Sequence, residues 1–428
     1  MDYYIFRDGD KDTPPTNWQS KFGGSAWEYV PALGKWYLHL FDVTQADLNW
    51  DNPRVREELK EIIRFWKKKG VKGFRFDVVN LISKPEQFEN DASGDGRRFY
   101  TDGPHVHEYL KELTADTGIE DMITVGEMSS TSLENCIRYS DPEEKELSMC
   151  FNFHHLKVDY KDGDKWELTA PDYAGLKSLF ETWQEGMLEH NGWNALFWCN
   201  HDQPRIVSRL GDTKKYWKES AKMLAACIHM LRGTPYIYQG EELGMTNAGY
   251  EDIREYRDVE SMNYYQIMRR NKKTREEALE ILRQRSRDNG RTPMQWNPEA
   301  YAGFSEHEPW IGLPENYRYI NVEKEEQDPD SILNYYRRLT ALRKEYPVIQ
   351  KGDIAFLYRD QQEVFAYRRC LGGQELLALN NLSGEPVKLS EPGPMEGYQM
   401  LIANYPEKEK GERLEGLRPY ESIVLFHA

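Results

Sequence analysis

Three short segments, each an apolar run that ends in a carboxylate, constrain the fold of this chain more than any other feature. They lie at residues 73–77, 124–127 and 198–203, and their acids are Asp77, Glu127 and Asp202. Polar residues and then a helix-like stretch follow each of them. A strand of a (β/α) barrel delivers an acid to the C-terminal rim of the barrel in this way. Three acids from three strands would suit glycosidic bond cleavage, in which two carboxylates do the acid–base and nucleophilic work. The third would hold the sugar.

The first clear helix is expected over residues 54–69. Asn52 is a favourable N-cap, and Pro53 suits the first helical position. Gly70 ends the helix, and the strand that carries Asp77 follows. Helical spacing predicts one apolar stripe on this helix, formed by Val55, Leu59, Ile62, Ile63 and Trp66.

Strands and helices alternate over most of the chain. Strands are expected near residues 73, 123, 150, 197 and 236, and helices over residues 105–114, 176–189, 218–231 and 330–346. This alternation predicts parallel βαβ units. Only these five barrel strands can be recognised, whereas a closed barrel of this kind needs eight. Either three strands escape this interpretation or the chain lacks them.

The pattern predicts three regions. Residues 1–50 are rich in Trp, Gly, Asp and Pro, lack helical periodicity and form a loop-rich segment with one strand near residues 35–41. Residues 51–347 form the α/β barrel region. Residues 348–428 carry short alternating strands with turn signals, which predict a small antiparallel β domain.

Composition excludes some classes of partner. The net charge of −16 argues against nucleic acid, because the basic footprint that such binding needs is missing. No apolar run approaches the roughly 18 residues of a membrane span, and we expect no signal peptide. The five cysteines include no CxxC pair, so we expect reduced thiols in a cytoplasmic protein. We expect no cofactor, no metal site and a monomer. The aromatic content of 13% fits a sugar-binding cleft or an aromatic core equally well.

Several longer motifs together resemble the α-amylase superfamily, family 13 of the glycoside hydrolases. They lie at residues 17–28, 73–77, 124–127, 200–205, 233–245 and 287–296, so the resemblance covers essentially the whole chain. It implies a (β/α)8 TIM barrel with a C-terminal antiparallel β domain. It also implies that the first three barrel strands are missing here and that residues 1–50 are the remainder of loop domain B, which follows the third strand. We therefore expect little activity from these 428 residues alone.

The resemblance assigns roles to the acids and their neighbours. It implies that Asp77 is the nucleophile, Glu127 the acid/base and Asp202 the acid that binds sugar hydroxyls. His201 and Arg291 match residues that contact the sugar. Arg75 lies two residues before Asp77, so the two side chains would share one face of the strand, and the guanidinium would keep the carboxylate ionised.

Within the family, the motifs are most similar to the oligo-1,6-glucosidase group, and above all to its phosphotrehalase branch. That branch hydrolyses trehalose 6-phosphate to glucose and glucose 6-phosphate through a covalent glucosyl–Asp intermediate. Residues 153–160, acidic in the 1,6-glucosidases, here carry His155 and Lys157, whose positive character would favour a sugar phosphate. Surface variation is the alternative explanation of this segment. For the whole chain, the alternatives are a glucosidase that acts on neutral oligosaccharides and an inactive truncated fragment.

Overall fold

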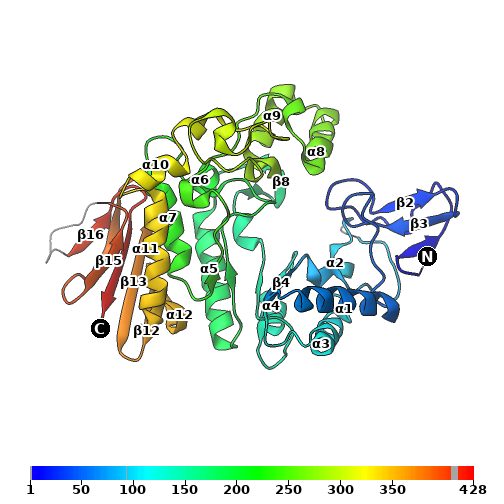
Figure 1. Cartoon of the computed structure of the whole chain (residues 1–428), viewed down its shortest axis with the longest axis horizontal. Helices are drawn as coiled ribbons and strands as arrows, with labels where there is room; N and C mark the ends of the chain where they lie inside the picture. Colours follow the sequence, from blue (N-terminus) through cyan, green and yellow to red (C-terminus); the bar gives the residue numbers. More distant parts are fainter. Residues whose placement is uncertain (1, 93, 406–412) are drawn as a thin grey trace. The chain divides into compact units, whose positions relative to one another are not determined.

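The computed structural model describes residues 2–92, 94–405 and 413–428. The chain divides into two compact units, which are treated separately below. Unit 1 comprises Met1–His154 and Glu189–Ala195, and unit 2 comprises His155–Leu188 and Leu196–Ala428. This division differs from the three regions predicted from the sequence, whose boundaries stay a prediction. Figure 1 shows the course of the chain and the element labels.

A parallel sheet in unit 1 positions two of the predicted acids. Strand β4 (Gly73–Phe76) pairs with β5 (Ile123–Glu127), and β5 pairs with β6 (Met149–Phe151), both in parallel register. Helices α1 (Pro53–Lys68) and α3 (Val106–Thr117) precede β4 and β5. The predicted alternation of strands and helices is therefore present here, with strand ends close to the predicted ones. Among the described residues, β4 pairs only with β5 and so lies at an edge of its sheet.

Helix α1 begins as its sequence predicts. The side chain of Asn52 accepts a hydrogen bond of 3.0 Å from the backbone N–H of Arg54, and Pro53 is the first helical residue. The apolar stripe is only partly buried. Val55 and Ile63 are buried, whereas Ile62 and Trp66 are about half exposed, at 54% and 50%. The described residues of unit 1 therefore cover only part of this apolar stripe.

The first 50 residues form a small antiparallel sheet with long loops. Its strands are β1 (Phe6–Asp8), β2 (Trp27–Val30) and β3 (Lys35–Leu38), in the order β1-β3-β2. Two indole rings, those of Trp18 and Trp27, are almost fully buried in the core beneath it. The loop-rich character predicted for this region, including a strand near residue 35, is confirmed.

Unit 2 contains the helices α5 (Tyr173–Glu189, whose last residue belongs to unit 1), α7 (Trp217–His229) and α11 (Ile332–Glu345), as predicted. The predicted strands at 195–200 and 235–238 are much shorter: β9 (Ala195–Leu196) and β10 (Thr234–Pro235) have two residues each. The residues that follow, 197–200 and 236–238, lie outside the strands and form loops. Two unpredicted helices, α8 (Val259–Arg270) and α9 (Arg275–Arg285), begin at the caps Asp258 and Thr274.

The C-terminal region of unit 2 is antiparallel, as its sequence predicts. The main sheet has the order β11-β12-β13-β17-β15. Its strands are β11 (Asp353–Leu357), β12 (Val364–Leu371), β13 (Gln374–Asn381), β15 (Gln399–Ala403) and β17 (Ser422–His427). A second pair comprises β14 (Val387–Gly393) and β16 (Leu414–Leu417).

One buried arginine joins this sheet to two helices. The guanidinium of Arg369, on β12, donates hydrogen bonds of 2.7–2.9 Å to the backbone carbonyls of Met230, Ile349, Gly352 and Asp353. Met230 caps α7, and Gly352 caps α12 (Pro347–Lys351). Burial lowers the pKa of Arg369 to about 10, so it stays charged at neutral pH. Figure 1 shows α7 and α11 beside this sheet.

In the part of the chain that the structure describes, no helix is both long and apolar enough to cross a membrane. Within the same residues, no group of three or more His, Cys, Asp or Glu side chains is arranged to hold a metal ion. All five cysteines are free thiols, and all but Cys370 are buried.

Candidate active site

Arg75 brings two carboxylates together in unit 1. Arg75 lies on β4, Asp77 follows the end of β4, and Glu127 is the last residue of β5. One terminal nitrogen of the Arg75 guanidinium, Nη1, pairs with Asp77, and the other, Nη2, pairs with Glu127. The two acids differ in their exposure: the side chain of Asp77 is 71% exposed and that of Glu127 only 6%. The site therefore combines one open and one nearly buried carboxylate.

The backbone directly after Asp77 is strained. Val78 has φ 36° and ψ 41°, in the left-handed region. A β-branched residue rarely adopts this conformation, because its Cβ substituents crowd the backbone. Such strain persists only where the surroundings fix the chain, and it concentrates at functional sites. The short helix η1 (Val79–Leu81) follows at once.

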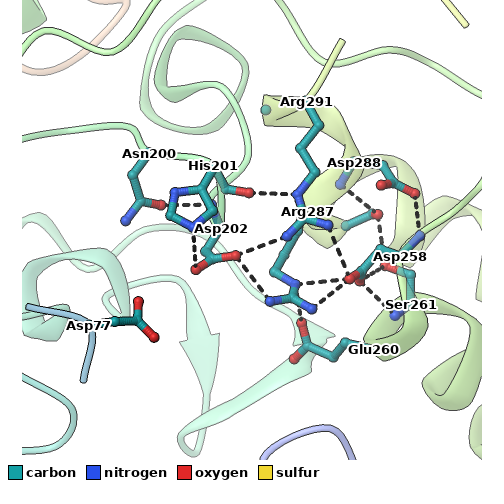
Figure 2. Close-up of polar contacts among 12 residues, drawn as sticks. Asp77, Asn200, His201, Asp202, Asp258, Glu260, Ser261, Arg287, Asp288 and Arg291 are labelled. Atoms are coloured by element: carbon teal, nitrogen blue, oxygen red, sulfur yellow. Dashed lines mark hydrogen bonds and ion pairs between the residues drawn. The ribbon is translucent and has the colours of Figure 1, made fainter. Parts of the chain in front are cut away.

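Asp202 is the centre of a polar cluster in unit 2, which Figure 2 shows. The side chains of Arg287 and Arg291 both point to its Oδ1 atom, from Nη1 of Arg287 at 3.0 Å and from Nη2 of Arg291 at 2.9 Å. Its other oxygen, Oδ2, lies 3.4 Å from Nε2 of His201. The backbone N–H of Asp202 donates to the side chain of Asn200 at 2.8 Å, which fixes the turn. Two arginines thus hold the carboxylate in one orientation.

Two further carboxylates lie behind the arginines. Nη2 of Arg287 donates to Oδ1 of Asp258 at 2.6 Å, and its Nε lies 3.3 Å from Glu260. Burial alone would lower the pKa of Arg287, but the charges of Asp258, Glu260 and Asp202 outweigh it and raise the pKa. Burial alone would raise the pKa of Asp258, yet Arg287 and the hydrogen bonds from Ser261 lower it. Arg287 and Asp258 therefore stabilise each other's charged forms.

Asp258 also begins helix α8. Its Oδ2 atom accepts hydrogen bonds of 2.8 Å from both the backbone N–H and the hydroxyl of Ser261. A carboxylate at a helix N-terminus is stabilised by the free N–H groups of the first turn. One carboxylate thus anchors α8 and Arg287 at the same time, and α8 supports the position of Asp202 indirectly.

The Arg287–Arg291 turn packs tightly against the Asp202 loop. It forms the short helix η5 (Arg287–Gly290), and Nε of Arg291 donates to the backbone carbonyl of His201 at 2.8 Å. A Cβ atom at Gly290 would lie 2.5 Å from the carbonyl oxygen of Gln203, too close for any side chain. Glycine at this position therefore permits the close approach.

The structure gives His155 a packing role. Its Nε2–H donates to the backbone carbonyl of Phe197 at 2.8 Å. Its ring lies 5.2–5.7 Å from the rings of Phe180, Phe197 and Trp198. Nε2 is therefore occupied, and the predicted part of His155 in substrate binding stays a prediction. Lys157, after the short helix η2 (His154–Leu156), is half-buried.

Sequence reasoning missed Arg287, Asp258 and Glu260. Arg287 lies four residues before Arg291, a spacing that places both side chains on one face of a helical turn, so this signal could have been found. Asp258 precedes a stretch at helical spacing and has the residue type of an N-cap. Nothing in the sequence indicates that these residues converge on Asp202.

Similarity to a known protein family defines the class of this protein. Residues 1–352 match the family described as alpha amylase, catalytic domain. The chain therefore belongs to the α-amylase family of glycoside hydrolases, and it is an enzyme of that class.

Particular relatives are similar along nearly the whole chain. The trehalose-6-phosphate hydrolase of Escherichia coli (strain K12) is 52% identical over 424 residues, which are 98% of this chain and 76% of the relative. The oligo-1,6-glucosidase of Parageobacillus thermoglucosidasius is 44% identical over 436 residues, 99% of this chain and 77% of the relative. Among solved structures, the crystal structure of Bacillus licheniformis trehalose-6-phosphate hydrolase matches with a TM-score of 0.92 and 53% sequence identity. The match covers 99% of this chain and 78% of the B. licheniformis chain.

Proposed function

We propose that this protein is a retaining α-glucoside hydrolase that cleaves trehalose 6-phosphate to glucose and glucose 6-phosphate. The observation that carries the proposal is the pairing of Asp77 and Glu127 with one guanidinium. A retaining mechanism needs two carboxyl groups about 5 Å apart. The binding of both carboxylates to neighbouring nitrogens of one guanidinium supports such a spacing.

In the first step, Glu127 protonates the glycosidic oxygen while Asp77 attacks the anomeric carbon. The bond to the leaving sugar breaks, and a glucosyl–Asp77 ester forms. In the second step, ionised Glu127 takes a proton from water, the water attacks the ester, and glucose leaves with its configuration retained. The ion pair with Arg75 orients the Asp77 carboxylate for the attack.

Asp202 would bind hydroxyl groups of the glucose unit. Its Oδ1 atom is bound by two arginines, whereas Oδ2 faces His201. A carboxylate fixed in this way can accept hydrogen bonds from sugar hydroxyls without reorganising. His201 and Arg291 are the proposed neighbouring contacts to the same sugar.

Recognition of the phosphate is assigned first to Lys157, because its ammonium group is cationic at neutral pH, and second to His155, whose Nε2 also binds the carbonyl of Phe197. The trehalose-6-phosphate hydrolase of E. coli is more similar to this chain than the oligo-1,6-glucosidase of P. thermoglucosidasius, at 52% against 44% identity, and this favours the phosphorylated substrate. Five free thiols favour a cytoplasmic location. A monomer stays a prediction.

For the fold, we propose a (β/α)8 barrel in which β4, β5, β6, β9 and β10 are five of the eight strands. Three further βα units would pair with the free edge of β4 and cover α1. Three half-exposed apolar side chains on α1 support this, namely Ile62, Phe65 and Trp66. Residues 1–50 would then belong to loop domain B, residues 51–347 to the barrel and residues 348–428 to the C-terminal domain.

The substrate proposal is tested by comparing kcat/KM for trehalose 6-phosphate, trehalose and isomaltose. We expect trehalose 6-phosphate to exceed isomaltose by at least about 100-fold, since a desolvated charge contact is worth a few kcal/mol. Lys157→Gln should raise KM for trehalose 6-phosphate but leave the hydrolysis of nitrophenyl α-glucoside unchanged. Comparable turnover of isomaltose would contradict the phosphorylated substrate and favour a neutral-oligosaccharide glucosidase.

A further inference from the structure

Asn80 joins the two loops that follow the proposed catalytic strands. It lies three residues after Asp77, within η1, and its side chain is fully buried. Its Nδ2 atom donates to the backbone carbonyl of Ser129 at 2.9 Å, and its Oδ1 atom accepts the N–H of Ser129 at 2.9 Å. Ser129 lies two residues after Glu127. One amide group therefore makes a two-point contact with the chain next to the proposed acid/base.

Asp102 fixes the orientation of Asn80. Its Oδ1 atom accepts a hydrogen bond of 3.0 Å from Nδ2 of Asn80, and its backbone N–H donates to the carbonyl of Asn80 at 2.9 Å. Because Nδ2 has two acceptors and Oδ1 has a donor, a flipped amide would place like groups against each other. The direction of the Asn80 side chain is thus determined.

The carboxylate of Asp102 also binds the region after β5. It accepts hydrogen bonds from the hydroxyl of Thr131 at 2.9 Å, the amide of Asn135 at 2.9 Å and the hydroxyl of Tyr139 at 2.7 Å. Asn135 and Tyr139 lie on α4 (Leu133–Ser140). The carboxylate of Asp102 therefore binds both Asn80 and helix α4.

From this network we infer that Asn80 is a positioning residue, which sets Glu127 against Asp77 by tying the two loops together. The inference rests on the proposed function of these two acids. The left-handed conformation of Val78, between Asp77 and Asn80, is consistent with it, because a strained residue needs a fixed residue on either side. Arg75 holds one side of Val78 through Asp77, and Asn80 holds the other.

A leaving-group series tests the inference. Aryl α-glucosides with poor leaving groups need proton donation by Glu127, whereas activated ones need it far less. Displacement of an acid by about 1 Å can cost roughly 100-fold. We expect Asn80→Ala to lower kcat about 100-fold for the poorest leaving groups, less than about 5-fold for the most activated, and to change KM little.

Asn380→Ala is the matched control. Asn380 is also a fully buried asparagine with two hydrogen bonds, to Phe365 and Ser422, but it lies in the C-terminal sheet. A loss of folded protein would lower all rates by one factor, so this variant should show no dependence on the leaving group. The same uniform loss in Asn80→Ala, or no loss, would overturn the inference.

Hydrogen exchange separates this inference from the proposed function. In Asn80→Ala, the N–H of Ser129 loses its acceptor and should exchange at least about 10-fold faster, while the amides of β5 stay protected. Unchanged exchange at Ser129 would overturn the contact between the loops. If the unaltered protein hydrolyses no α-glucoside, the proposed function fails, and the exchange result alone decides whether Asn80 joins the loops.

Discussion

Arg287 binds Asp202 through a single terminal nitrogen, Nη1, at 3.0 Å. Its other nitrogens contact Asp258 and Glu260. One guanidinium therefore lies among three carboxylates. Its positive charge offsets the repulsion between their negative charges. A residue that sequence reasoning missed thus supports the proposed sugar-binding acid.

Replacement of Arg287 should be costly. In Arg287→Gln the buried carboxylate of Asp258 would lose its main cation, and we expect a loss of about 3 kcal/mol in the free energy of unfolding. Chemical denaturation measures this loss. Arg254→Gln is the control, because Arg254 pairs with Asp252 at the surface, where solvent screens the pair and its loss should change stability little. Equal effects of the two variants would argue against the role given to Arg287.

The two proposed catalytic acids should act as a unit. Asp77→Asn or Glu127→Gln should lower kcat by roughly 10⁴-fold or more on trehalose 6-phosphate, and the double variant should be scarcely worse than either single one. Circular dichroism should show an intact fold. Glu61→Gln, which alters an exposed acid on α1, should leave kcat unchanged. Near-normal activity of either single variant would exclude the mechanism.

Glu241 should make stability depend on pH. It lies in the short helix η3 (Glu241–Leu243) and is fully buried, and burial raises its pKa from near 4.5 to about 7. A hydrogen bond of 2.8 Å from Tyr336 and the charge of Arg205 oppose this shift without cancelling it. Between these two pH values the folded state keeps a proton that the unfolded chain releases. The free energy of unfolding therefore falls as pH rises from about 4.5 to about 7.

The Glu241→Gln variant checks this directly. Because glutamine does not titrate, the variant should gain stability relative to the unaltered protein as pH rises, by up to about 3 kcal/mol at pH 8 compared with pH 4. Urea denaturation at both pH values measures the gain. Burial also raises the pKa of the neighbouring Glu242, so part of the slope should remain in the variant. Identical slopes for the two proteins would show that Glu241 does not carry the effect.

The exposed apolar face of α1 should be a contact surface. If three further βα units cover it, Trp66→Lys should lower self-association of the 428-residue chain, and ultracentrifugation would detect this. Lys68→Glu, on the last turn of α1, is the charge control. Unchanged self-association of Trp66→Lys would disprove that this face is a contact surface.

The parts of the structure that follow local rules could be predicted from the sequence. Helix α1, with its Asn52 cap, and the strands that lead to Asp77 and Glu127 depend on short-range patterns, so their positions were predicted within a few residues. The predicted strand at 195–200 was too long, because β9 ends at Leu196 and the residues between it and Asp202 form a loop. The periodicity of the sequence does not show where strand pairing stops.

The contacts that complete the site depend on distant parts of the chain. Asp258 and Arg287 are 29 residues apart, and Asn80 and Ser129 are 49 apart. No local spacing encodes such pairs. The residue type of His155 predicts a contact with an anionic substrate, but it does not predict that the imidazole ring packs against Phe180 and Phe197.

The position of Arg369 has a consequence for how the chain can come apart. Arg369 lies on a strand of the C-terminal sheet. Its guanidinium donates hydrogen bonds to backbone carbonyls at the C-terminal ends of α7 and α12. If that sheet separated, the carbonyls at both helix ends would lose their donor, and the buried cation would lose three of its four acceptors and keep only Asp353 of β11. Partial detachment would therefore cost nearly as much as complete unfolding of this region. The sheet and these helices should open as a single cooperative block, so a cut near residue 348 would damage the fold instead of removing an independent appendage.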